Sequence, residues 1–281
     1  MDSRIARFEA VSFAYPEIID NEVSATVGKE APGGTGNYGR KVFNEIDLEI
    51  PGGVVSFVGQ NGTGKSTALL LAAGRLQPVS GRVVLFDTDT ISLTDEEERN
   101  RYASFIYQNM EFETEDTVAE LFSFVYENGF IDESDRNEEF IPNLTKVFEL
   151  GEALGRKLQD LSKGEMQRAI LVFSLLYGSR SIMMDEPIFA LEDYQKKAAL
   201  EYLVDFAHRK GTPLYFSLHE LDLSKSFADY VVLFYTDGRN PIVGSVEEIL
   251  TRPLIEDAYQ YPAAMLHQRE HLWRERLMKL P

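Results

Sequence analysis

The sequence predicts an α/β fold in which a core with a mostly parallel sheet carries an N-terminal antiparallel β part and an inserted helical subdomain. Three observations indicate this fold. Apolar runs of the length of buried strands recur along the chain and end in glycine or polar residues. Two N-terminal stretches instead alternate apolar and polar residues. Between residues 117 and 161, apolar side chains follow the period of helices.

The N-terminal β part is expected to consist of two strands, at residues 7–15 and 41–50. Pro16 ends the first strand, because proline has no N–H to donate to a strand ladder. The intervening residues 17–40 are rich in glycine and proline at their centre and predict a mobile insertion. No apolar strand runs into these glycines, which argues against a second phosphate-binding loop.

The centre of the predicted core is Gly59–Thr67, which fits the P-loop pattern G-x-x-x-x-G-K-[ST]. The apolar strand Val54–Val58 runs into it and the helical pattern Thr67–Gly74 follows it, as in P-loop NTPase cores. Glycines let the backbone approach a ligand, and their N–H groups can form an anion nest. Lys65 is placed to reach the β- and γ-phosphates, and Ser66 to ligate Mg²⁺. The candidate nucleotide-binding residues are Gly59, Asn61, Gly62, Thr63, Gly64, Lys65, Ser66 and Thr67.

The remaining elements follow from apolar runs and helical periods. Further strands are expected at residues 82–86, 102–107, 181–184, 213–218 and 230–235. Helices are expected to begin at 95–99 and at 244–251, and to cover 167–177, 200–210 and 263–280. One domain then spans residues 1–281, with its core at 1–94 and 163–260, the helical subdomain at about 95–162 and a C-terminal helix at 261–281.

Polar residues with catalytic potential follow two of these strands. Asp185 ends a buried strand and fits the carboxylate that holds Mg²⁺ through its water shell. Glu186 could polarise an attacking water as a general base. His219 follows a later strand and could contact the γ-phosphate or fix that water, because parallel sheets bind ligands at the carboxyl ends of their strands.

Composition excludes several classes of protein. The formal net charge of −18 argues against a nucleic-acid partner, which needs clusters of Lys and Arg. The chain has no cysteine, so it has neither disulfides nor thiolate metal sites. Its apolar runs are too short to span a bilayer and its N-terminus lacks the features of a signal peptide, so we expect any link to a membrane to go through a partner.

Taken in order, these motifs resemble those of the ATPase subunit, or nucleotide-binding domain, of ABC transporters, and the resemblance runs over nearly the whole chain. Gly59–Thr67 resembles the family's Walker A, and Ser181–Glu186 its Walker B with the catalytic glutamate. Leu161–Glu165 resembles the signature motif, and Pro187–Glu192 resembles the D-loop. Single residues match as well: Tyr15 resembles the A-loop aromatic that stacks on adenine, Gln108 the Q-loop glutamine that senses Mg²⁺ and the membrane partner, and His219 the switch histidine.

The resemblance implies ATP and Mg²⁺ as cofactors. It implies catalytic roles for Glu186, His219 and Gln108, and a metal site formed by Ser66, Gln108 and Asp185. Two such subunits, alike or unlike, would sandwich two ATP molecules head to tail, with Ser162 and Gly164 acting on the nucleotide of the other subunit. Integral membrane permease subunits would carry the substrate and hold this chain, as a cytoplasmic peripheral protein, on the inner face of the cell membrane. Their docking groove should lie near Gln108 and the stretch 112–126.

The sequence departs from the family pattern at several positions. The signature usually reads L-S-G-G-Q, but Lys163 replaces its first glycine and Glu165 its glutamine, adding a positive and a negative charge. Glu192 stands where the D-loop usually has Asp. The insertion at 17–40 lengthens the path from Tyr15 to the P-loop, which leaves Phe13 and Tyr38 as alternative base-stacking residues.

Other functional classes stay open on the sequence alone. A soluble ABC ATPase that drives no transport, such as the iron–sulfur assembly type, also has one domain. The repair type usually carries a long coiled coil, and no sustained heptad pattern exists here. The translation type usually carries two ATPase domains and basic segments, whereas this chain has one predicted domain and a strong negative charge. A third option is a slow member of a heterodimer, suggested by the altered signature.

Overall fold

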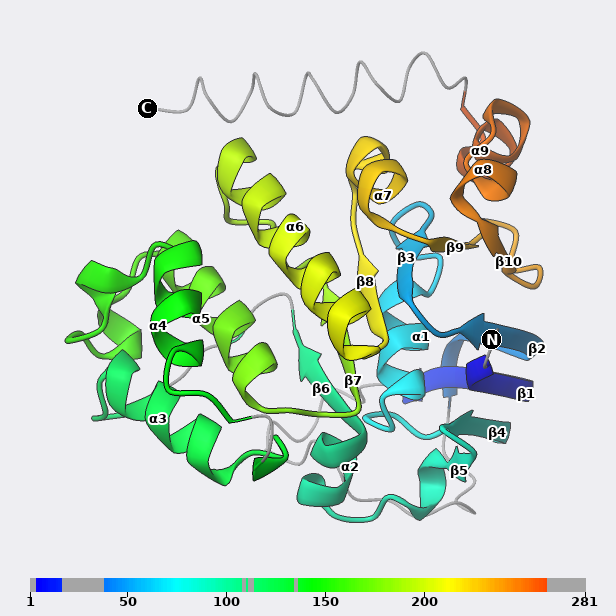
Figure 1. Ribbon diagram of the computed structural model, residues 1–281. Helices are drawn as coiled ribbons and strands as arrows, with labels where there is room; N and C mark the ends of the chain where they lie inside the picture. Colours follow the sequence, from blue (N-terminus) through cyan, green and yellow to red (C-terminus); the bar gives the residue numbers. More distant parts are fainter. Residues whose placement is uncertain (1–3, 17–37, 108–109, 111–113, 134–135, 262–281) are drawn as a thin grey trace, which may run out of the picture.

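The computed structural model describes residues 4–16, 38–107, 110, 114–133 and 136–261. Two sheets lie side by side, and helices cover the larger one (Figure 1). The four-stranded sheet has the order β2-β1-β4-β5 and the six-stranded sheet the order β10-β9-β3-β8-β7-β6. The predicted α/β class is confirmed.

The four-stranded sheet is the predicted antiparallel part, since β1 pairs antiparallel with both β2 and β4. Its strands are β1 (Arg4–Pro16), β2 (Tyr38–Pro51), β4 (Ser80–Leu85) and β5 (Thr88–Asp89). Residues 38–40, which were predicted to belong to the insertion, instead begin β2, and the rest of the insertion lies outside the described residues. The alternation in β1 breaks where Ala10 takes a φ of 48° and the pairing shifts register.

The six-stranded sheet forms the core of the predicted P-loop fold. Its parallel strands are β3 (Val54–Val58), β6 (Ala103–Ile106), β7 (Ser181–Asp185), β8 (Leu214–Ser217) and β9 (Tyr230–Leu233), and β10 (Ile242–Ser245) pairs antiparallel with β9. The helix predicted within residues 244–251 is present, but its start at residue 244 was wrong, because Gly244 lies in β10 and pairs with Val231 of β9. Ser245 then caps α8 (Val246–Ile249) through a capping box with Glu248.

Two layers of helices enclose the six-stranded sheet. Helix α1 (Lys65–Ala72) lies between the two sheets, where Ala68, Leu69 and Leu71 are buried against both. On the other face lie α5 (Lys163–Leu176) and α6 (Asp193–Lys210). Shorter helices complete the layers: the 3₁₀ turn η1 (Thr90–Ser92), α2 (Glu96–Tyr102), α7 (Leu221–Phe227) and α9 (Arg252–Tyr259).

Helix starts were the least accurate part of the sequence prediction. Helix α5 begins at Lys163 rather than residue 167, and α6 begins at Asp193 rather than residue 200. In both cases a capping box begins the helix in a polar stretch, before its apolar period becomes visible. Of the predicted C-terminal helix, only Tyr261 lies within the described residues.

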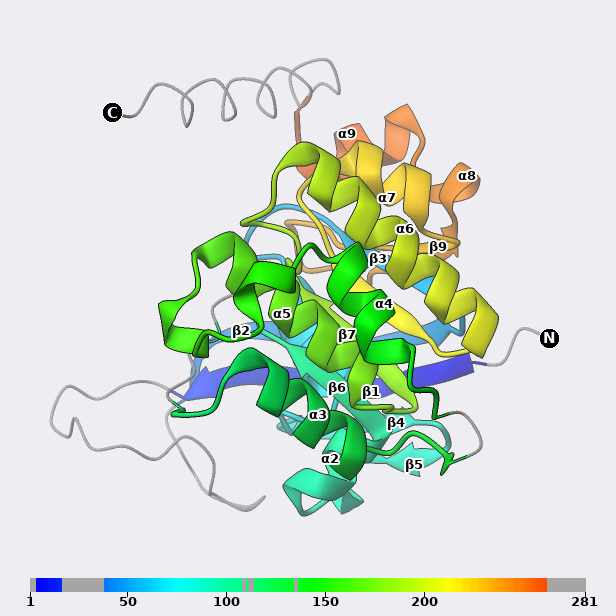
Figure 2. The same ribbon diagram turned by 60° about the vertical axis from the view of Figure 1, so that its left-hand side comes forward.

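The helical part packs against α5 (Figure 2). It consists of α3 (Val118–Asn128), α4 (Phe140–Val147) and the 3₁₀ turns η3 (Gly151–Ala153) and η4 (Leu158–Asp160). The predicted range of 95–162 also contained β6, which pairs with β7 in the six-stranded sheet. We therefore propose that this subdomain begins near Thr117. In the described part of the chain, no helix has both the length and the apolar composition that a bilayer span requires.

Candidate nucleotide-binding and hydrolysis site

Strand pairing brings the predicted catalytic segments to one edge of the six-stranded sheet. Ser217 pairs with Phe57 of β3 on one side and with Asp185 of β7 on the other. Because these strands are parallel, the segments that follow them leave the sheet at the same edge. The P-loop, Glu186 and His219 all lie just beyond this row.

The P-loop takes backbone conformations that its glycines permit. Gly59, Gly62 and Gly64 have φ angles of 151°, 80° and 101°. A Cβ added to Gly64 would lie 2.6 Å from the ring of Phe43. Gly64 is the N-cap of α1, so the first N–H groups of this helix face the loop without intrahelical partners. These groups and the helix dipole favour an anion at this position.

Lys65 is almost fully buried, with a relative exposure of 6%. Its Nζ donates hydrogen bonds to the carbonyl oxygens of Gly59 at 2.8 Å and Gln60 at 3.0 Å. Burial lowers the pKa of Lys65, while the nearby carboxylates of Glu186 and Asp185 act in the opposite direction. The lysine therefore lies within electrostatic range of both predicted acids.

Ser217 joins the two acids, and the sequence prediction missed it. Its hydroxyl donates to Oδ1 of Asp185 at 2.5 Å and accepts the main-chain N–H of Glu186 at 3.1 Å. Ser217 is fully buried. The available signal was a hydroxyl at the end of an otherwise apolar strand, two residues before His219.

Glu186 and His219 contact each other directly. Nε2 of His219 lies 2.5 Å from Oε1 of Glu186. Glu186 has a φ of 50°, an unusual value for a residue other than glycine, asparagine or aspartate, and such strain concentrates at functional sites. The next residue, Glu220, is held by Nζ of Lys196 at 2.6 Å, which fixes the turn that carries His219.

Tyr15 lies beside the P-loop, where its hydroxyl hydrogen-bonds to Oγ1 of Thr67 at 3.1 Å. Its side chain is 44% exposed, and the ring of Phe13 packs edge-on against it at 5.0 Å. Phe13 is only 5% exposed, and this burial argues against Phe13 as the residue that stacks on the base. The side chains of Tyr38 and Gln108 lie outside the described part of the chain.

The signature residues are placed differently. Ser162 is the N-cap of α5 and forms a capping box with Glu165. Gly164 lies close to the D-loop, since a Cβ added to it would be 3.3 Å from the carbonyl oxygen of Ala190. Within the described ranges, neither Ser162 nor Gly164 forms a hydrogen bond with the P-loop. The structure thus gathers Tyr15, the P-loop, Asp185, Glu186 and His219, and leaves the signature outside this group.

The family follows from comparison with known proteins. The family model of the ABC transporter matches residues 43–189, just over half of the chain. The chain belongs to the ABC transporter family. It is 31% identical over 216 residues to an ABC transporter ATP-binding protein of Archaeoglobus fulgidus, a match that covers 76% of this chain and 88% of the relative.

Two further relatives are named for transport. Petrobactin import ATP-binding protein FpuD of Bacillus anthracis is 28% identical, with coverage of 80% of this chain and 83% of the relative. Hemin import ATP-binding protein HmuV of Nocardia farcinica is 28% identical, with coverage of 84% and 82%.

Solved structures share the fold. An ATP-binding subunit of an ABC transporter matches with a TM-score of 0.69 and 20% identity, covering 94% of this chain and 98% of that one. A dimeric cassette in a post-hydrolysis state, with ADP and Pi bound, matches with a TM-score of 0.67 and 20% identity, covering 86% and 99%.

As a member of this family, the protein binds and hydrolyses ATP and powers transport across a membrane. The relatives' names thus favour transport over the non-transport alternatives.

Proposed function

We propose that the site at the sheet edge binds ATP together with Mg²⁺. Ser66 offers a hydroxyl oxygen and Asp185 a carboxylate oxygen, the hard ligands that Mg²⁺ prefers. No cluster of three or more His, Cys, Asp or Glu able to hold a metal occurs among the described residues. A site with few protein ligands fits Mg²⁺, which keeps several waters and shares the phosphates of the nucleotide. When bound, the ion would neutralise charge on the β- and γ-phosphates. Gln108 stays a predicted third member of this site.

Each of the chain's own site residues would then have a separate role in the reaction. Lys65 would exchange the carbonyl oxygens of Gly59 and Gln60 for phosphate oxygens, and Tyr15 would stack on the base. Glu186 would accept a proton from the attacking water, and His219, 2.5 Å from its carboxylate, would orient that water. The observation that carries this proposal is the contact between an acid and a histidine at the edge that also carries the P-loop.

We propose that a second ATPase subunit completes each site. Ser162 and Gly164 open helix α5, whose first N–H groups favour an anion, yet they lie apart from their own P-loop. A neighbour with the same fold is dimeric, which supports this arrangement. The signature of one subunit would therefore act on the γ-phosphate held by the other.

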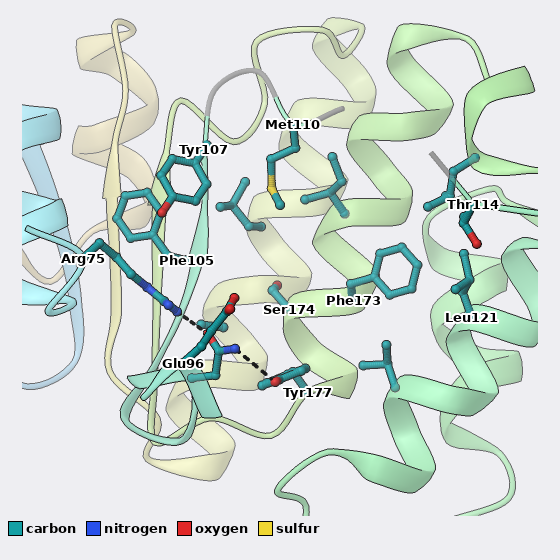
Figure 3. Close-up of a pocket in the computed structure, with 16 residues that line it drawn as sticks. Arg75, Glu96, Phe105, Tyr107, Met110, Thr114, Leu121, Phe173, Ser174 and Tyr177 are labelled. Atoms are coloured by element: carbon teal, nitrogen blue, oxygen red, sulfur yellow. Dashed lines mark hydrogen bonds between the residues drawn. The ribbon is translucent and has the colours of Figure 1, made fainter. Parts of the chain in front are cut away.

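A cavity of about 450 Å³ lies between β6, α3 and α5 (Figure 3). Its walls are mainly apolar, and Phe105, Met110, Leu121 and Phe173 are among the residues that line it. We propose that an apolar segment of a membrane permease docks here, beside the predicted position of Gln108. This docking would hold the subunit on the inner, cytoplasmic face of the membrane. Charge reversals at 111–116 that left the complex intact would contradict this assignment.

The direction of transport is proposed to be import. Several relatives are named for import, among them FpuD and HmuV. In inside-out vesicles the lumen corresponds to the outside of the cell, so ATP-dependent release of preloaded substrate would support import. Vesicles of that orientation that accumulated the substrate in an ATP-dependent manner would show export and overturn the import assignment.

The proposed chemistry is tested with Glu186→Gln and Lys65→Ala. We expect Glu186→Gln to bind ATP, to lose hydrolysis and to trap a closed pair of subunits, because only the water-activating acid is lost. Lys65→Ala should weaken ATP binding itself. Glu201→Gln, an exposed change on α6, is the matched control. Hydrolysis at the parent rate by Glu186→Gln would refute its assignment.

The partner is tested by purifying tagged Glu186→Gln chain with ATP from detergent-solubilised membranes. We expect a stoichiometric integral membrane protein to copurify. Recovery of soluble partners alone would contradict docking to a permease.

A further inference from the structure

Arg156 contacts the altered signature motif from outside it. Its Nη1 donates to Oε1 of Glu165 at 2.9 Å, and its Nη2 donates to the carbonyl oxygen of Asp160. Glu165 in turn binds Ser162 three ways: Oε2 accepts the main-chain N–H at 2.8 Å and the hydroxyl at 2.7 Å, while Oγ of Ser162 accepts the N–H of Glu165 at 3.3 Å. The guanidinium of Arg156 thus contacts the signature serine indirectly, through the carboxylate of Glu165.

The carboxylate of Glu165 is charged in this arrangement. Hydrogen bonds from the side chain and main chain of Ser162 lower its pKa, and the positive charge of Arg156 lowers it further. A carboxylate 2.7 Å from the serine hydroxyl would repel any phosphate that approached the same hydroxyl. Arg156 offsets that charge on the side of the carboxylate that Ser162 does not occupy.

Other helix starts in the protein provide an internal comparison. Capping boxes with glutamate at the third helical position also begin α3 (Thr117–Glu120) and α8 (Ser245–Glu248). In the part of the chain that the structure describes, neither Glu120 nor Glu248 forms an ion pair, whereas Glu165 pairs with Arg156. Capping alone therefore does not require the arginine. The distinguishing feature of α5 is that its first turn carries the signature.

The segment that carries Arg156 is held in place from both ends. The main-chain carbonyl of Arg156 accepts the N–H of Val118 at 2.9 Å, and Lys157 and Thr117 form an antiparallel β-bridge. Two residues further on, the buried Leu158 lines the cavity between β6, α3 and α5. The guanidinium is therefore presented to Glu165 from a main chain fixed against α3 rather than from a free loop.

We propose that Arg156 is a positioning residue for the nucleotide of the second subunit. It neutralises Glu165, so that Glu165 caps the helix without repelling the γ-phosphate and Ser162 can turn its hydroxyl proton to that phosphate. Lys163, exposed at the first position of α5, adds positive charge on the same helix end. This inference rests on the proposed function, because it requires that the signature act on the other subunit's nucleotide.

The test uses Arg156→Gln, which keeps hydrogen-bonding groups but removes the charge. In the Glu186→Gln background, purified with its second ATPase subunit, we measure the ATP concentration that gives half-maximal closed pair. We expect Arg156→Gln to raise it roughly three- to tenfold, an effect that shrinks at high salt because the charges are partly exposed. Arg156→Lys should stay near the parent. Arg136→Gln is the matched control, since Arg136 also donates to a main-chain carbonyl of the helical part, that of Glu127.

The double variant Arg156→Gln/Glu165→Gln separates charge from structure. With a neutral residue at 165, the arginine has no charge to offset, so the double variant should return to within about twofold of Glu165→Gln alone. Equal losses in the single and double variants would show a purely structural role and overturn the proposal. No change in Arg156→Gln, with an ATP-dependent pair still formed, would also overturn it and leave the proposed function standing. Failure of the Glu186→Gln chain to form any such pair would overturn both.

Discussion

Removing the hydroxyl of Ser217 should damage both hydrolysis and stability. Ser217→Ala deletes the hydrogen bond to the Asp185 carboxylate and leaves the main-chain N–H of Glu186 without its acceptor. A hydrogen bond to a charged group contributes about 1.5–3 kcal/mol, and an unsatisfied buried donor costs about 1–3 kcal/mol. We therefore expect a loss of roughly 3 kcal/mol in the free energy of unfolding, which lowers Tm by about 6–12 °C in a chain of this size.

The effect on the reaction should fall mainly on kcat. Ser217 fixes where the main chain of Glu186 leaves β7, and a shift of about 1 Å in a catalytic group can cost about 100-fold. We expect kcat for ATP hydrolysis to fall by roughly 10- to 100-fold. The P-loop and Tyr15 are unchanged, so binding of ATP measured without turnover should change by less than about threefold.

The matched control is Ser174→Ala. Ser174 is also buried, and its hydroxyl donates to the carbonyl oxygen of Leu171 within α5, away from the acids. It should lower stability modestly and leave kcat near the parent value. If Ser217→Ala hydrolysed ATP at the parent rate, the claim that Ser217 organises Asp185 and Glu186 would be refuted.

Two further predictions concern the base and the effect of pH. Tyr15→Ala should weaken ATP binding, measured by calorimetry, by roughly 2- to 12-fold through loss of aromatic stacking. The affinity of Tyr15→Phe for ATP should stay within about threefold of the parent. Equal losses of affinity in both variants would assign the effect to the hydrogen bond with Thr67 instead. Hydrogen bonds from Ser162 lower the pKa of Glu165 in the folded protein, so its stabilising contribution is present above the ordinary glutamate value of about 4.5 and is lost as the pH falls through the folded pKa. Thermal unfolding from pH 7 downward should therefore show a larger fall in Tm below about 4.5 for the parent than for Glu165→Gln, and parallel curves would contradict it.

The sequence predicted the elements that create the site because local patterns specify them. The apolar run before the P-loop motif predicted strand β3 with its observed bounds, Val54–Val58. The apolar run at 181–184 predicted β7 and the acid at its end. Open α/β sheets bind ligands at the carboxyl ends of their parallel strands. The common location of Asp185, Glu186 and His219 could therefore be inferred without coordinates. Their roles in the reaction remain proposals.

What the sequence did not predict depends on contacts between distant segments. Ser217 acts through β7, a strand 32 positions earlier in the chain, and nothing in its own neighbourhood indicates that partner. Helix starts at Lys163 and Asp193 depend on capping boxes in polar stretches, where hydrophobic periodicity gives no signal. Helix α7 and strand β10 are too short to show a period of their own.

The altered signature illustrates why a departure from a family pattern needs its structural neighbours before it is interpreted. On the sequence alone, Glu165 places a negative charge where a phosphate should bind. In the structure that carboxylate completes the cap of α5 and is paired with Arg156, so its charge already has partners within the subunit. The replacement of glutamine by glutamate therefore does not by itself indicate a weakened site. It shifts part of the requirement for activity to Arg156, which lies outside the motif and close to the cavity proposed for the permease.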